Sequence, residues 1–391
     1  DARILKSMCD LAEWLAAQTH CKVTLAETCP LSAQGTLLPG PTRVQIPGIS
    51  PARFKQALAA GRPVYSSVDI QSYIQDDLAL FEQVRPDLVI GDFRLSLSSS
   101  ARMAGVRYAT ITNAYWCPTS QAGYPMPVLP WTGLLPLWLE ESLFGLGLRL
   151  AMPAHCRAVN AARSAASLGS LGHDLRRVYT DADTVLIADP PGLFELGRLP
   201  STHHFLGPIL WAPRVDLPVS WNEVPVTGPV AYVALGSSGP HGALGQVLQA
   251  LTGAGWFALA ASAGAENSTL HLPNARLAPF LPGDQAAAKA DVVICNGGSM
   301  GCQQALVANR PVLGIASNMD QFMNMAGIVA SGAGICLRAD RLTPERIRLA
   351  CRRLLLEPSF KSAAARLGAL MRETDAQSNL LALLPGLIAS M

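Results

Sequence analysis

Short apolar segments rich in β-branched residues alternate with amphipathic helical segments along most of the chain. In the first half, strands are predicted at 22–27, 87–92, 107–112 and 184–188, and helices at 3–18, 68–84, 95–104 and 155–169. In the second half, strands are predicted at 230–235, 256–261, 292–295, 312–315 and 334–337, and helices at 243–253, 283–289, 298–308 and 320–331. Such alternation predicts an α/β protein whose parallel sheets are covered by helices on both faces.

A proline-rich segment divides this pattern into two units. Residues 207–229 hold five prolines and little periodicity. A chain of 391 residues also exceeds what one ordinary core supports. We therefore predict a Rossmann-like domain over 1–206, a linker over 207–229, a second such domain over 230–373, and a helix over 374–391 that is a candidate to cross back to the first domain. Loops at the carboxyl ends of the strands are expected to line a cleft between the domains.

Composition limits the partners and the compartment. The net charge is only +2 and no basic block occurs, so nothing favours a nucleic-acid partner. Nine scattered cysteines without a C-x-x-C spacing are typical of free thiols in a reducing cytoplasm. The most apolar stretch, 135–152, is interrupted by Glu140, Glu141 and Arg149, and no stretch reaches the ~18 apolar residues of a membrane span.

A glycine pair stands where the predicted strand 292–295 meets the next helix. Asn296, Gly297, Gly298 and Ser299 form this junction. The first N–H groups of a helix have no partner within it and carry the positive end of the helix dipole, and glycines let an anion approach them. The junction indicates a phosphate site, although a tight turn that simply needs glycine accounts for the same residues.

Two other strand ends of the second half carry polar residues. Gly236, Ser237 and Ser238 follow the first strand and can face the opposite side of a pyrophosphate. Neither glycine turn matches the dinucleotide-binding or P-loop fingerprint. Asp320 and Gln321 open the helix after strand 312–315. A carboxylate there either caps that helix or accepts hydrogen bonds from sugar hydroxyls.

Taken together, these motifs resemble those of the GT-B glycosyltransferases, specifically the bacterial UDP-glycosyltransferase family that modifies small lipophilic acceptors. They occur in the family's order as "GSSG" (236–239), "FLP" (280–282), "NGGSMGCQQALVANRP" (296–311) and Asp320-Gln321 with Asn324. The resemblance covers 230–335, and it extends more loosely into the first half through "DLVIGDFR" and "GVRYATITNAYW". It implies a GT-B fold, a UDP- or dTDP-linked sugar as donor, and no cofactor.

The resemblance assigns donor-binding residues by position. They are Gly236, Ser237, Ser238, Phe280, Leu281, Asn296, Gly297, Gly298, Ser299, Met300, Gln304, Asp320 and Gln321. The 296–299 turn would hold the diphosphate, with 237–238 opposite it. The backbone around Leu281 would meet the base, Gln304 the ribose, and 320–321 the sugar.

Three positions depart from the family pattern. Asn296 stands where the family has histidine, Met300-Gly301 where it has Gly-Thr, and Gln304 where it has glutamate. An amide can still donate to a phosphate, and Gln304 can still contact a ribose, but without a carboxylate. Donor affinity or nucleotide choice is therefore expected to differ from that of the family.

The family's reaction needs a general base for the acceptor and stabilisation of the leaving diphosphate. The helix N-terminus at 297–299 would supply the second without a metal. The resemblance implies a histidine base in the loop before the first helix, which is expected ahead of Asp1 because the chain opens inside a helical pattern. Its aspartate partner matches Asp92, which alternatively caps helix 95–104.

The aromatic and leucine-rich segment 113–147 is expected to meet the acceptor, with Asn113, Tyr115 and Trp116 at its start. The alternative structure for this segment is a core helical hairpin. Membrane contact by it is only weakly supported, because few Lys or Arg residues flank it. Two other functions remain open: a UDP-sugar 2-epimerase, which the greasy segment argues against, and a non-catalytic relative acting as a partner or sensor. Nothing in the sequence indicates an oligomeric state.

Overall fold

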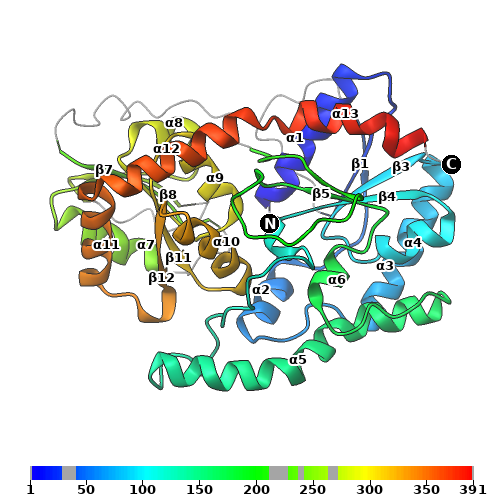
Figure 1. Ribbon diagram of the computed structural model, residues 1–391, viewed down its shortest axis with the longest axis horizontal. Coiled ribbons are helices and arrows are strands. Elements are labelled where there is room, and N and C mark those ends of the chain that lie inside the picture. Colours follow the sequence, from blue (N-terminus) through cyan, green and yellow to red (C-terminus); the bar gives the residue numbers. More distant parts are fainter. Residues whose placement is uncertain (1, 29–40, 211–227, 237–241, 263–271, 390–391) are drawn as a thin grey trace.

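The computed structural model describes residues 2–28, 41–210, 228–236, 242–262 and 272–389, and it has two halves lying side by side (Figure 1). The helices of the first half are α1 (Ala2–Gln18), α2 (Pro51–Ala59), α3 (Ser67–Val84), α4 (Leu97–Ala104), η1 (Ala114–Trp116), α5 (Leu137–Ala165) and α6 (Leu175–Tyr179). Its strands are β1 (Thr24–Glu27), β2 (Thr42–Gln45), β3 (Leu88–Asp92), β4 (Arg107–Thr112), β5 (Thr184–Ile187) and β6 (His203–Phe205). β1 and β2 form a parallel pair, and the other four form a parallel sheet in the order β3-β4-β5-β6.

The second half is built on one parallel sheet in the order β12-β11-β10-β7-β8-β9. Its strands are β7 (Val230–Ala234), β8 (Phe257–Ala261), β9 (Ala275–Ala278), β10 (Val292–Cys295), β11 (Val312–Ala316) and β12 (Gly334–Arg338). Its helices are α7 (Ala243–Thr252), α8 (Gly283–Lys289), α9 (Ser299–Val307), α10 (Met319–Ala330), η3 (Ala339–Arg341), α11 (Pro344–Leu356), α12 (Pro358–Glu373) and α13 (Ala376–Ala389).

Alternate side chains of the central strand β7 enter two different cores. Val230 and Tyr232 pack with the buried residues of α8, α9 and α12 on one face of the sheet. Ala231 and Val233 pack with α7 and α11 on the other. Because side chains alternate between the faces of a strand, a strand covered on both sides must be apolar throughout. The predicted α/β class with parallel sheets covered on both faces is confirmed.

The last helix leaves the second half and packs on the first. Leu380 and Leu387 of α13 share a core with Ala109 of β4, Leu186 of β5 and Leu11 of α1. In Figure 1 the chain passes in α12 across the second half and then in α13, drawn in red, over the first. The predicted linker falls largely on residues 211–227, which lie outside the described residues.

The segment before residue 155 differs from the prediction. A helix was predicted only at 155–169, but α5 begins at Leu137 and continues through Pro153 to Ala165. Its first half is not a core hairpin either, since Leu143, Leu146 and Leu150 are exposed. In the described part of the chain, no helix is long and apolar enough to cross a membrane.

Candidate active site

The strand order of the second sheet reverses at its centre. From β7 the chain moves outward to β8 and β9, and from β10 it moves the other way to β11 and β12. Open α/β sheets bind ligands outside the carboxyl ends of the strands at such a point. Ala234 of β7 pairs with Cys295 of β10, so the chain leaves these two strands at neighbouring points of the sheet edge. Gly236, two residues after Ala234, has a left-handed φ of +68°, whereas Ser237 and Ser238 lie outside the described residues.

The turn from β10 into α9 requires glycine at one position. Gly297 has a φ of +81°, and a Cβ there would lie 2.8 Å from Cγ of Met325. Asn324 fixes the same peptide, because its Nδ2 donates to the Gly297 carbonyl over 2.8 Å and its side chain is buried. The neighbouring Gly298 has an ordinary φ of −71°, so its backbone does not demand glycine.

The N-terminus of α9 faces the edge of the sheet without a side-chain cap from its N-cap residue, Gly298. The Gly298 N–H instead donates to Oδ1 of Asn296 over 3.0 Å. Ser299 and Met300 form the first turn of α9, whose N–H groups have no partner within the helix by position. With the positive end of the helix dipole, this turn is suited to bind an anion.

The segments predicted to contact the base and the ribose lie against each other. Phe280 and Leu281 follow β9 and lead into α8. A Cβ on Gly283, at the start of α8, would lie 2.6 Å from Oε1 of Gln304, so the Gln304 amide lies against this segment. Leu281 is buried in the core of the second half. Which of these residues contact a nucleotide stays a prediction.

The start of α10 separates the roles of two neighbouring residues. Asn318 is the N-cap, and Gln321 completes a capping box with it. Oε1 of Gln321 accepts from the N–H of Ser317 over 2.8 Å. Asp320 is therefore not the cap of this helix. Its carboxylate instead accepts hydrogen bonds from the predicted acceptor residues Tyr115 and Trp116 of the first half.

Asp92 ends β3, and the structure excludes the alternative that it caps the following helix. That helix, α4, begins at Leu97, and its N-cap is Ser96. Burial first, and the negative charge of Asp320 second, raise the pKa of Asp92 to about 7. Asp92 thus lies within electrostatic reach of a carboxylate of the other half, which fits a position facing the cleft.

Asp189 joins the two halves, although it is not among the residues predicted from the sequence. It follows β5 and is fully buried. Oδ2 accepts from the Ala114 N–H over 2.7 Å and from Nδ2 of Asn113 over 3.1 Å, and Oδ1 accepts from Nε2 of Gln303 over 2.9 Å. Nδ2 of Asn113 also donates to the Ser299 hydroxyl over 3.1 Å, so the predicted acceptor and diphosphate residues are linked. Burial raises the pKa of Asp189 to about 6, and these three hydrogen bonds oppose the rise.

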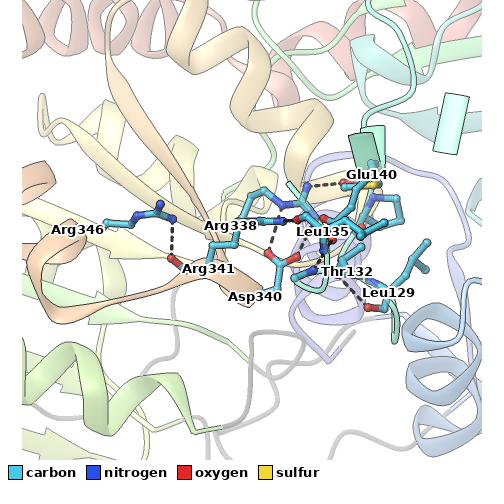
Figure 2. Close-up of polar contacts among 11 residues, drawn as sticks. Leu129, Thr132, Leu135, Glu140, Arg338, Asp340, Arg341 and Arg346 are labelled. Carbon is cyan, nitrogen blue, oxygen red and sulfur yellow. Dashed lines mark hydrogen bonds and ion pairs between the residues drawn. The ribbon is translucent and has the colours of Figure 1, made fainter. Parts of the chain in front are cut away.

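A second set of polar contacts joins the halves at the loop 126–135 (Figure 2). Arg338 donates to carbonyl oxygens of this loop, and Arg341 pairs with Glu140 over 2.8 Å. Burial disfavours the charge of Glu140, but two backbone N–H groups of the loop and the Arg341 guanidinium hold its pKa below the usual value. The segment predicted to meet the acceptor is thereby tied to the half predicted to hold the donor.

Comparison with known proteins places this geometry among sugar-transferring enzymes. Residues 256–378 match the family model described as erythromycin biosynthesis protein CIII-like, C-terminal domain. A PGL/p-HBAD biosynthesis rhamnosyltransferase of Mycobacterium bovis (strain BCG / Pasteur 1173P2) is 41% identical over 315 residues, which cover 81% of this chain and 70% of that protein. An inactive PGL/p-HBAD biosynthesis glycosyltransferase of the same strain is 41% identical over 194 residues, which cover 50% and 53%.

The fold is shared with more distant solved structures. The spinosyn rhamnosyltransferase SpnG superposes with a TM-score of 0.62 at 18% identity, over 88% of this chain and 87% of that one. At this identity the likeness concerns the fold alone. It confirms the GT-B architecture that the motifs of the second half predict.

Proposed function

This chain belongs to the glycosyltransferase family of the PGL/p-HBAD biosynthesis enzymes, and on that basis we propose that it transfers a sugar, with inversion, from a UDP- or dTDP-linked donor to a small lipophilic or aromatic acceptor. In this proposal, residues 1–206 bind the acceptor and 230–373 bind the donor. The observation that carries it is the glycine turn that opens α9 at the central switch point of the second sheet.

The donor's diphosphate would sit on the N-terminus of α9. The turn 296–299 offers backbone N–H groups and a hydroxyl there, and Asn296 adds an amide. As the bond between the anomeric carbon and the diphosphate breaks, negative charge grows on the leaving oxygen, and a fixed helix N-terminus stabilises it. In the described residues no group of three or more His, Cys, Asp or Glu side chains is arranged to hold a metal ion. Metal independence stays a prediction.

The acceptor hydroxyl would lose its proton to a histidine base oriented by Asp92. A carboxylate bonded to one imidazole nitrogen fixes the tautomer and stabilises the imidazolium that forms. The position of Asp92 at the end of β3 and its closeness to Asp320 support this assignment. The predicted contacts of Asn113, Tyr115 and Trp116 with the acceptor stay a prediction.

The proposal is tested by incubating the protein with dTDP-rhamnose, UDP-glucose and related donors and a panel of lipophilic phenols and alcohols. Mass spectrometry should detect a glycosylated acceptor and the released nucleoside diphosphate in equal amounts. Release of a nucleoside diphosphate together with an epimerised free sugar would instead favour the UDP-sugar 2-epimerase.

A non-catalytic role is the second candidate, because one relative at 41% identity is described as inactive. The substitutions at Asn296, Met300 and Gln304 fit that role, since they change the turn that would hold the donor. Nucleotide binding measured by calorimetry, without turnover of any donor, would favour it over the transferase.

A further inference from the structure

The carboxylate of Asp320, in the first turn of α10, is bound by two aromatic residues of the opposite half. The Tyr115 hydroxyl donates to Oδ1 over 3.0 Å, and the indole N–H of Trp116 donates to the same oxygen over 2.8 Å. Within the described residues no hydrogen bond to the second oxygen, Oδ2, is found. One oxygen of the carboxylate is therefore held by the protein, and the other is left for a ligand.

Both donors are fixed in place by packing. Tyr115 is fully buried, and its ring lies edge-on to Phe194 with ring centroids 5.1 Å apart. Trp116 lies edge-on to Tyr179 at 4.7 Å. Nε of Arg176 also donates to the Tyr115 carbonyl over 3.2 Å, which fixes the backbone between the two rings. The donors can therefore hold the carboxylate in a single orientation.

These hydrogen bonds favour the charged form of Asp320 against the effect of burial. Burial raises its pKa, while the hydrogen bonds from Trp116 and Tyr115 lower it. Burial also keeps the pKa of Tyr115 far above its usual value, so its hydroxyl remains a donor. The other titratable groups that interact with Asp320 are Asp92, Asp189 and Tyr179, none of them a cation. Among the described side chains, the two aromatic donors favour the ionised form.

We propose that Tyr115 and Trp116 are positioning residues for the donor sugar: they hold Oδ1 of Asp320, so that Oδ2 accepts a sugar hydroxyl in a fixed geometry. The inference rests on the proposed transferase and gives the first half a part in recognising the donor. A sugar hydroxyl donates best to a charged oxygen. The contact is assembled only when the two halves are docked, because the acceptor and the donors of these hydrogen bonds come from different halves.

The test compares a nucleoside diphosphate with the corresponding nucleotide sugar, using dTDP with dTDP-rhamnose and UDP with UDP-glucose. In the wild type, the affinity ratio of sugar-bearing to sugar-free ligand measures what the sugar contributes. Calorimetry on Tyr115→Phe, Trp116→Phe and the double variant should show nucleoside diphosphate binding within about twofold of wild type. Loss of hydrogen bonds to a charged acceptor should weaken nucleotide-sugar binding by roughly tenfold to a hundredfold.

Tyr179→Phe is the matched control, because it removes a hydroxyl from the same ring cluster and leaves both hydrogen bonds to Asp320 in place. It should leave both affinities unchanged. In the double variant, the acidic limb of the pH profile for nucleotide-sugar binding should move to higher pH, since Asp320 loses the donors that favour its charge. A purely structural role would not produce that shift.

The inference is overturned if the double variant binds the nucleotide sugar as well as wild type does, or if both ligands weaken in parallel. Because the readout is binding, it remains decisive without turnover. A wild type that binds the sugar through this contact but transfers nothing would refute the proposed function and leave the inference standing. If the wild type transfers sugar and the double variant keeps the wild-type ratio of nucleotide-sugar to nucleoside diphosphate affinity, the proposed function stands and the inference is refuted.

Discussion

Replacing Asp92 by asparagine should stabilise the protein and impair the reaction at the same time. The pKa of Asp92 is raised from 3.8 to about 7, so its ionised form is disfavoured in the folded state. The folded protein therefore binds this proton more tightly than the unfolded chain does. The associated stability is fully present below about pH 4 and is lost as the pH rises through about 7. Asparagine has the same shape and carries no charge at any pH.

The magnitude follows from the two pKa values. Their difference corresponds to ~4 kcal/mol at alkaline pH, at 1.36 kcal/mol for each pKa unit. Part of the Asp92 surface reaches solvent, so we expect about half of this. At pH 8, Asp92→Asn should raise the thermal unfolding midpoint by roughly 4–8 °C for a domain-sized cooperative unit. At pH 4.5 the gain should largely vanish, because wild-type Asp92 is then protonated.

The control is Asp87→Asn, which removes the same charge from an exposed position just before the same strand. It should change the midpoint little at either pH. Turnover of Asp92→Asn should fall by roughly one to four orders of magnitude, with nucleoside diphosphate affinity little changed. Equal stability of wild type and variant at pH 8, or near-wild-type turnover, would refute the assignment of Asp92 as a destabilised, functional carboxylate.

Three further predictions concern the turn at 296–299, the leaving diphosphate and the buried Asp189 between the halves. Gly298→Val should weaken nucleoside diphosphate binding at least tenfold in calorimetry, with little change in the thermal unfolding midpoint. Gly297→Ala should instead lower the unfolding midpoint, because the φ of Gly297 is +81° and a Cβ there would meet Met325. Unchanged nucleoside diphosphate affinity in Gly298→Val, with a lowered midpoint, would contradict the assignment of this turn as the diphosphate site. Sugar transfer should continue in EDTA, and a strict requirement for Mg²⁺ or Mn²⁺ would count against α9 as the stabiliser of the leaving group. Asp189→Ala should destabilise by ~2–4 kcal/mol in urea unfolding, since the Ala114 N–H loses a charged acceptor; an unchanged urea midpoint would disprove this.

The elements that the sequence predicted best are those with a strong local pattern. The strands at 107–112 and 292–295 match the structure at both ends, because each is rich in β-branched residues and is followed by an asparagine, Asn113 or Asn296. The short strands β2 and β9 were missed, since "TRVQ" and "ARLA" have no clear alternation. The helix predicted at 155–169 begins earlier, as α5 at Leu137, and it continues through Pro153, a residue that usually interrupts helices.

The site was predictable where a motif is contiguous, and not where it depends on distant contacts. The turn at 296–299 was located from its glycines alone. The capping role of Gln321 had a local signal, because Asn318 stands three residues before it. Asp189 has the same signal as Asp92, a carboxylate after an apolar strand, but it lies outside the contiguous family motifs. The contact between Tyr115 and Asp320 spans 205 positions and has no local pattern.

The position of α13 has a consequence for how the polypeptide matures during synthesis. The hydrophobic core that α1, β4 and β5 share is completed by Leu380 and Leu387. A ribosome that has finished residue 206 must add about 180 more before these leucines exist, which takes roughly 10–40 s at 5–20 residues per second. All strands of the second sheet lie between 230 and 338, so that sheet has its full complement earlier. The half made first is thus the last to close, and during that interval its unfinished core leaves apolar surface exposed.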